Sequence, residues 1–138
     1  MTDEELLLEH LANGGLTGAF VVDGQSYPAP KNQLLSFRET RLDNNERALV
    51  VLQTTNPTSE ASNFHQSKVL SVLFTSTSEG DNDTLVAKVR AEQIYQYLKS
   101  NQSYECLYGI VCFGVSRPYY TSLGRVVYEL NCTIQKNV

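Results

Sequence analysis

The sequence predicts an α+β fold, with a mostly antiparallel sheet of about four to five strands and two helices packed on one face. Apolar side chains recur at helical spacing between Leu85 and Leu98, and they alternate with polar ones from Arg125 onward. Shorter apolar runs of strand length lie between turn residues. Because 138 residues with 41% hydrophobic content can bury one core, we expect a single domain, 1–138.

The N-terminal residues predict a short helix. Thr2 and Glu5 form a T-x-x-E capping box, in which hydroxyl and carboxylate satisfy free amides. An apolar stripe follows, and Asn13-Gly14-Gly15 ends it. A helix this short is not stable alone, so it must dock on the sheet. The stripe consists of Leu7, Leu8 and Leu11.

The next fifty residues predict two strands separated by irregular chain. Leu16 to Val22 is the first strand, and Asp23-Gly24 is a hairpin turn. Residues 25–33 contain two prolines and predict an extended surface arm, because proline cannot donate to a ladder. Leu34 to Arg47 fits either an irregular strand or a loop packed on the core. Ala48 to Thr54 is a continuous apolar run that suits a central strand.

Thr55 to Ser67 is polar, contains a proline and has no period, so it predicts a long loop. We expect this loop to be mobile in the free subunit, with Phe64 as its anchor on a partner. Residues 68–77 then resume the sheet. Val69 and Leu73 are apolar on the second face of that strand, which predicts helices on one side and a partner on the other.

The strongest helical pattern covers Leu85 to Leu98. Its apolar stripe contains Ala87, Ala91, Ile94 and Leu98, and Lys88, Arg90, Glu92 and Gln96 lie away from it. The acidic cluster before the helix contains Glu79, Asp81 and Asp83, and it lacks the EF-hand spacing. Helix capping explains these carboxylates better than a cation site.

Two strands close the chain. Residues 107–115 form one, in which Gly109 and Gly114 indicate a bulge or a close backbone approach. The second begins after Arg125, with one face predicted in the core and the other in water. The core face contains Val126, Tyr128, Leu130, Cys132 and Ile134, and the solvent face contains Arg125, Val127, Glu129, Asn131 and Thr133.

No motif predicts catalysis. His10 and His65 are the only histidines, and neither has a second ligand at metal spacing, so each is better explained as a solvent-exposed or hydrogen-bonded side chain. Nucleophile-elbow, Walker and Rossmann glycine patterns are absent. We therefore predict no catalytic, metal-binding or cofactor-binding residue and no cofactor, and expect that the protein is not an enzyme.

The composition of the chain limits the cellular compartments and the classes of binding partner that we expect. Cys106, Cys112 and Cys132 lack CxxC spacing, so they predict small buried side chains instead of a disulfide set or zinc site. The acidic N-terminus excludes a signal peptide, and no apolar run is long enough to span a membrane. With a net charge of −4 and scattered basic residues, specific nucleic-acid binding is not expected. These features predict a soluble protein made in a reducing cytoplasm.

Aromatic side chains in polar loops are the remaining candidates for function. Phe64 lies in one loop, and Tyr119 and Tyr120 lie beside Arg117 in another. Tyrosine and arginine are favoured at interface centres, although half-buried packing within the subunit explains them equally well. The predicted interface residues are Phe64, His65, Arg117, Tyr119, Tyr120 and Arg125.

The order of these elements resembles the tail terminator and related minor capsid, or tail-to-head joining, proteins of long-tailed bacteriophages. The resemblance spans nearly the whole chain. Its most specific parts are the helix ending in IYQYL and the closing strand with the pattern P, loop, G-R-x-x-Y-x-L-N. The matching residues of that strand are Pro118, Gly124, Arg125, Tyr128, Leu130 and Asn131.

The resemblance implies a structural virion protein at the head-proximal end of the tail, assembled in the host cytoplasm. Six subunits would form a ring that caps the tail tube, stops its polymerisation and gives the head a docking face. The implied partners are further copies of the chain, the tail tube protein and a head-completion or connector protein. DNA would pass through the ring without specific binding, and no membrane is involved.

Two alternatives remain open at this stage. One is a head-completion or connector-joining protein of the same virion, which has a similar size. The other is a small α+β domain or enzyme that binds a ligand near Arg117 and Tyr119. The lack of a set of nucleophile, base and orienting group counts against the second alternative.

Overall fold

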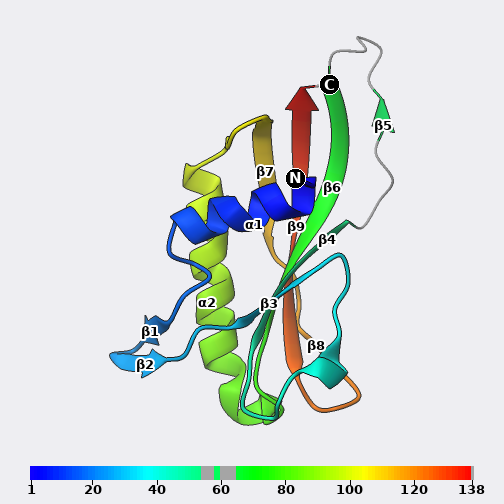
Figure 1. Ribbon diagram of the computed structural model, residues 1–138. Helices are drawn as coiled ribbons and strands as arrows, with labels where there is room; N and C mark the ends of the chain where they lie inside the picture. The colour runs from blue at the N-terminus through cyan, green and yellow to red at the C-terminus, as the bar shows by residue number, and fades with distance from the viewer. Residues whose placement is uncertain (54–57, 60–64, 138) are drawn as a thin grey trace.

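A computed structural model describes residues 1–53, 58–59 and 65–137 (Figure 1). The chain is α+β, with two helices and a central seven-stranded sheet in the order β3-β4-β6-β9-β7, to which β5 adds beside β6 and β8 beside β9. A separate hairpin is formed by β1 (Phe20–Val22) and β2 (Gln25–Tyr27). In the described part of the chain, no helix is both long and apolar enough to cross a membrane.

The sheet is mixed, and this corrects the expectation of a mostly antiparallel sheet of four to five strands. Its elements are β3 (Lys31–Leu34), β4 (Ala48–Gln53), β5 (Thr58–Ser59), β6 (His65–Thr75), β7 (Leu107–Val115), β8 (Tyr119–Tyr120) and β9 (Val126–Asn137). β3 pairs parallel with β4, whereas the other strand pairs described in this sheet are antiparallel. The parallel pair was missed because it joins segments that only the tertiary fold brings together.

Both helices cover the same face of the sheet (Figure 1). α1 (Asp3–Asn13) begins at Thr2 with the predicted capping box, and α2 runs from Gly80 to Ser100. The main core joins the two helices to the inner side chains of β4, β6 and β9. The predicted α2 stripe, Ala87, Ala91, Ile94 and Leu98, is fully buried there, as are Leu70, Val72, Phe74, Leu130, Cys132 and Ile134.

The N-terminal connections differ from the predicted ones. The Asp23-Gly24 turn is confirmed, and both residues have positive φ, as a two-residue hairpin turn requires. The predicted arm, residues 25–33, instead contains β2 and most of β3, with its two prolines in the connection between them. The loop predicted from Thr55 to Ser67 contains β5 and the start of β6, and its remaining residues lie outside the described part.

β7 bends at both predicted glycines. Its register against β9 shifts between Tyr108 and Val111 and again between Cys112 and Val115. Gly109 and Gly114 lie in these two intervals with φ of 60° and 98°, values that side chains disfavour. The bulges leave Cys112 opposite Cys132.

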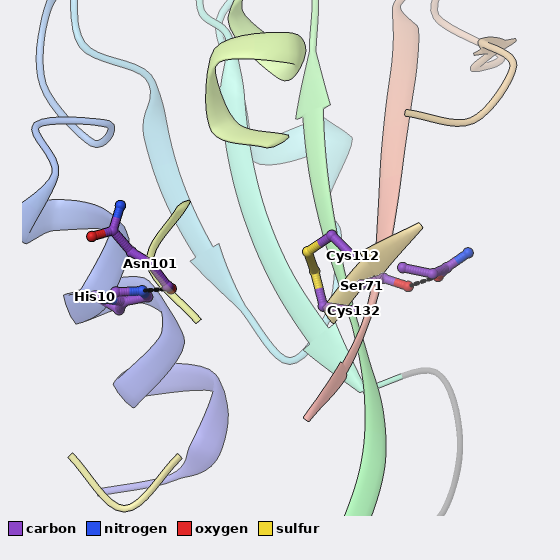
Figure 2. The surroundings of a disulfide bond; sticks show 6 residues. His10, Ser71, Asn101, Cys112 and Cys132 are labelled. Atoms are coloured by element: carbon purple, nitrogen blue, oxygen red, sulfur yellow. Dashed lines mark hydrogen bonds between the residues drawn. A yellow bond between two sulfur atoms is a disulfide. The ribbon is translucent and has the colours of Figure 1, made fainter. Parts of the chain in front are cut away.

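Cys112 and Cys132 form a disulfide, which corrects the prediction of free cysteines (Figure 2). The bond joins facing residues of β7 and β9 whose Cα atoms are 4.2 Å apart. Such pairing depends on strand register, which the spacing of 20 residues does not reveal. Cys106 is free and half-buried.

Candidate assembly surface

The face of the sheet opposite the helices, here called the outer face, has a covered half. Ala48, Val50, Leu73 and Val127 form a small buried cluster there. Phe37 and Leu42, from the segment between β3 and β4, pack against this cluster. Leu73 is therefore covered by its own chain, and this corrects the expectation that a partner covers it. The ambiguous segment Leu34 to Arg47 is mainly a packed loop with a 3-10 turn, Glu39–Arg41.

Arg125 holds the loop between β3 and β4 in place through hydrogen bonds. The alternation predicted it on the solvent face as an interface residue, but its side chain is only 2% exposed. Its guanidinium donates to the carbonyl oxygens of Glu46, Ser76 and Asp43, and its Nε lies 3.5 Å from a Glu39 carboxylate oxygen. The structure thus places Arg125 inside the subunit, where it joins the loop to β6 and β9.

The other half of the outer face, toward β7, is open. Val111 and Phe113 of β7 and Tyr119 of β8 are exposed there, and Phe113 is 72% exposed although it lies within a strand. Ser71 and Asn131 form a polar border, with 2.7 Å between the Ser71 hydroxyl and Asn131 Oδ1 (Figure 2). A large aromatic side chain so exposed on a strand is typical of a contact surface.

The predicted tyrosines lie on opposite faces of β8. Tyr119 pairs with Val127 and belongs to the outer face, whereas Tyr120 pairs with Val126 and turns toward the helices. The Tyr120 hydroxyl donates to Asp81 at 3.0 Å, and this hydrogen bond raises the pKa of Tyr120. Burial, and secondly the Glu129 carboxylate, raise the pKa of Tyr119. Arg117 is exposed just before β8.

The structure does not describe the side chains of two of the predicted interface residues. Phe64 lies outside the described residues, so its predicted role as a loop anchor stays a prediction. His65 is the first residue of β6, where its backbone pairs with Asn137 of β9. Of the other predicted residues at β8, Tyr119 lies on the outer face, Tyr120 on the opposite face, and Arg117 is exposed just before the strand.

Asp83 forms a buried ion pair that the sequence did not indicate. Its carboxylate accepts two hydrogen bonds from Arg47, at 2.9 and 2.6 Å, and one from the Thr77 amide at 3.0 Å. The Arg47 guanidinium lies over the Tyr27 ring, 4.8 Å from its centroid. Glu79 occupies the N-cap position without a side-chain cap. Asp83 therefore joins α2 to β4 and the β1–β2 hairpin instead of capping the helix.

Neither His10 nor the described acidic residues form a metal-binding group. His10 is buried beside the rings of Tyr97 and Tyr104, and its Nε2 is 2.8 Å from the Asn101 carbonyl oxygen (Figure 2). This confirms the expectation of a hydrogen-bonded histidine. Within residues 1–53, 58–59 and 65–137, no group of three potential ligands surrounds a metal position.

Leu35 and Phe113 are candidate contact residues that sequence reasoning missed. Leu35 follows β3, is 63% exposed and has φ of 73°, in the left-handed region that bulky residues rarely adopt. The sequence pattern predicts Phe113 only as a residue of the strand 107–115. Its position between Val111 and Gly114, out of phase with the inner residues of β7, was the available signal.

Comparison with known proteins identifies one family. The family described as phage tail termination protein matches residues 7–137, nearly the whole chain. No curated protein and no solved structure gives a significant match.

Proposed function

Because the chain belongs to the phage tail termination protein family, and hence has a structural role in the phage tail, we propose that it forms a hexameric ring at the head-proximal end of that tail. The ring caps the tail tube and ends its polymerisation. Its opposite side offers the docking face for a head-completion or connector protein. The match over residues 7–137 carries this proposal, and it favours tail termination over head completion.

The open half of the outer face supports self-association. A subunit that covers one half of its sheet with its own loop, and leaves Phe113, Val111 and Tyr119 exposed, has surface available for a neighbour. Contacts of the head-to-tail type close into a ring when the rotation between subunits allows it. Affinity then comes from buried area and repeated contacts, and no chemistry is required.

Charge supports the passage of DNA through the ring. Each chain carries a net charge of −4, so six copies carry −24. An acidic lumen repels phosphates, and the genome can slide through without specific binding. Tail tube contacts and head contacts are then made by opposite rims.

A tube-growth assay tests the proposal. Purified tail tube protein is allowed to polymerise with and without the chain, and tube lengths and ends are measured by negative-stain electron microscopy. We expect shorter tubes that carry a six-fold ring with a central hole at one end. A chain that stays monomeric at high concentration and leaves tube lengths unchanged contradicts the proposal, and binding to head portals alone would favour head completion.

A further inference from the structure

The sheet has two outer edges, β3 at one end of the strand order and β7 at the other. Building on the ring proposed above, we propose that each subunit joins its β3 edge to the β7 edge of the next subunit, with Leu35 packed against Phe113 of that neighbour. The occupant of the open surface is thus a second copy of the chain.

Among the described strands, β3 has a neighbouring strand on one side only. The amides of Lys31 and Leu35 donate to β4, to the carbonyl oxygens of Arg47 and Val51 at 2.8 and 2.9 Å. Because backbone groups alternate along a strand, those of Asn32 and Leu34 point away from β4. A hollow of about 420 Å³ lies beside them, lined by Leu8, Lys31–Leu34, Arg38, Arg41 and Leu42. This edge is therefore open to a further strand.

The β7 edge is open from Cys112 onward. A Cα–Cα distance of 4.2 Å identifies Cys112 and Cys132 as a closely spaced, non-hydrogen-bonded pair, so the backbone of Cys112 points away from β9. The bulge between Cys112 and Val115 interrupts this alternation at Gly114. The Ile110 amide, on this side too, donates to the Gln102 carbonyl oxygen at 2.9 Å, which closes the edge only before Cys112.

Leu35 and Phe113 lie at the two ends of one row across the sheet. Leu34 pairs with Val51, which places Leu35 beside Leu52; Leu52 pairs with Ser71, and Ser71 with Asn131. Cys112 pairs with Cys132, so Phe113 lies beside Asn131. The row therefore begins and ends with a large apolar side chain, 63% and 72% exposed respectively. If the two edges pair with Leu35 opposite Phe113, the row continues from one subunit into the next in the same register.

The directions of the two edge strands permit the joint. β3 is parallel to β4, and three antiparallel pairings then lead to β7, so β3 and β7 run in opposite directions. Neighbouring subunits of a ring are related by rotation about its axis, so the opposite directions of β3 and β7 are kept between subunits. The pair formed by β3 of one subunit and β7 of the next is therefore antiparallel. With Leu35 opposite Phe113, Leu34 lies opposite Gly114, at the second bulge of β7.

Charge favours the same register. Arg38 is exposed at the β3 edge, where Gln33 holds its backbone with hydrogen bonds of 3.0 and 2.8 Å. Gln33 belongs to the row that runs through Val50 and Leu73 to Glu129, near the β7 edge. In the described part of the chain, neither Arg38 nor Glu129 forms an ion pair. The joint therefore brings Arg38 of one subunit toward Glu129 of the next subunit.

The contact is tested by introducing opposite charges at the two apolar positions. Leu35→Lys and Phe113→Glu are measured singly and together by sedimentation velocity and negative-stain microscopy, with thermal melts to verify folding. Each single variant should raise the concentration for half-assembly at least ~10-fold, since it places a charge in an apolar contact. The double variant should recover most of this loss. Leu85→Lys, at a 57% exposed position on α2, is the matched control and should assemble normally.

The outcomes separate the two proposals. An unaltered chain that forms no ring, even with tail tubes present, overturns both. Rings that form equally well from the single variants, or single-variant defects that the double variant does not recover, overturn only the joint. If Phe113→Glu melts lower than the unaltered chain, Leu35→Ala and Phe113→Ala replace the charged pair. Additive losses for these two would then exclude direct contact, and non-additive losses would support it.

Discussion

The two halves of the outer sheet face belong to one sheet, but only one of them is covered by the chain itself. Over β4 and the adjoining end of β9, the chain folds its own loop back, packs Phe37 and Leu42 on the sheet and holds the loop with Arg125. Toward β7 it leaves Val111, Phe113 and Tyr119 exposed. Apolar residues on a strand therefore do not by themselves identify an interface, because the covering segment can belong to the same chain.

The largest expected effect comes from placing a charge in each half. Val127→Asp buries an unpaired carboxylate in the covered half and should lower the free energy of unfolding by on the order of 4 kcal/mol. Phe113→Asp, in the open half, should change it by less than about 0.5 kcal/mol. Urea titrations of both variants measure this. Equal losses would mean that Phe113 is part of the subunit core.

Arg125 is the next test, because it fastens the covering loop. Arg125→Met removes donors to three carbonyl oxygens and should cost about 3 kcal/mol. The loop should also become more sensitive to limited proteolysis between Glu39 and Glu46. Arg117→Met, at an exposed position, is the control and should leave stability unchanged. A stable Arg125→Met variant would show that Phe37 and Leu42 hold the loop without it.

In the open half, the Cys112–Cys132 disulfide joins β7 to β9 in addition to their strand pairing. The bond spans 20 residues, and closing a loop of that size restricts the unfolded chain by about 3 kcal/mol at most. Unfolding in denaturant with and without a reducing agent should therefore show a lower midpoint when reduced. The Cys112→Ala, Cys132→Ala chain should not respond to the reductant. If it does respond, Cys106 is the thiol involved.

The sequence predicted the elements whose period is set by burial. α2 and β9 were found because their buried residues repeat at 3.6 and 2 positions, and the β7 bulges were found from Gly109 and Gly114. β2 and β3 were missed because they are three and four residues long and each is held by one neighbouring strand. The signal of such pairing lies in the partner strand and not in the segment itself.

Prediction of the candidate surface was less complete, for the same reason. Tyr119 and Arg117 were recognised because they are aromatic or basic side chains in a polar loop. Arg125 was placed on the surface because alternation gives only the side of the strand, and it cannot show that a loop returns to cover that side. Leu35 and Phe113 become visible as a pair only when the register of the whole sheet is known.

The smallest expected effect is the ionisation of Tyr119, which reports on the open half directly. Burial, with a smaller contribution from Glu129, raises its pKa above the ordinary value of 10. The neutral phenol is therefore favoured in the folded state, and the associated stability is complete below pH 10 and is lost as the pH rises through the raised pKa. Tyrosinate absorbance of the unaltered chain, minus that of Tyr119→Phe, isolates this titration.

Glu129→Gln should return the Tyr119 pKa only part of the way toward 10, because burial is the larger cause. Glu105→Gln is the control, since Glu105 acts on Tyr104 and not on Tyr119. Assembly should raise the Tyr119 pKa further if the neighbouring subunit removes water from the open half. A pKa that is the same in the free chain and in the ring would place Tyr119 outside the contact, and would confine the joint to Leu35, Phe113 and the strand edges beside them.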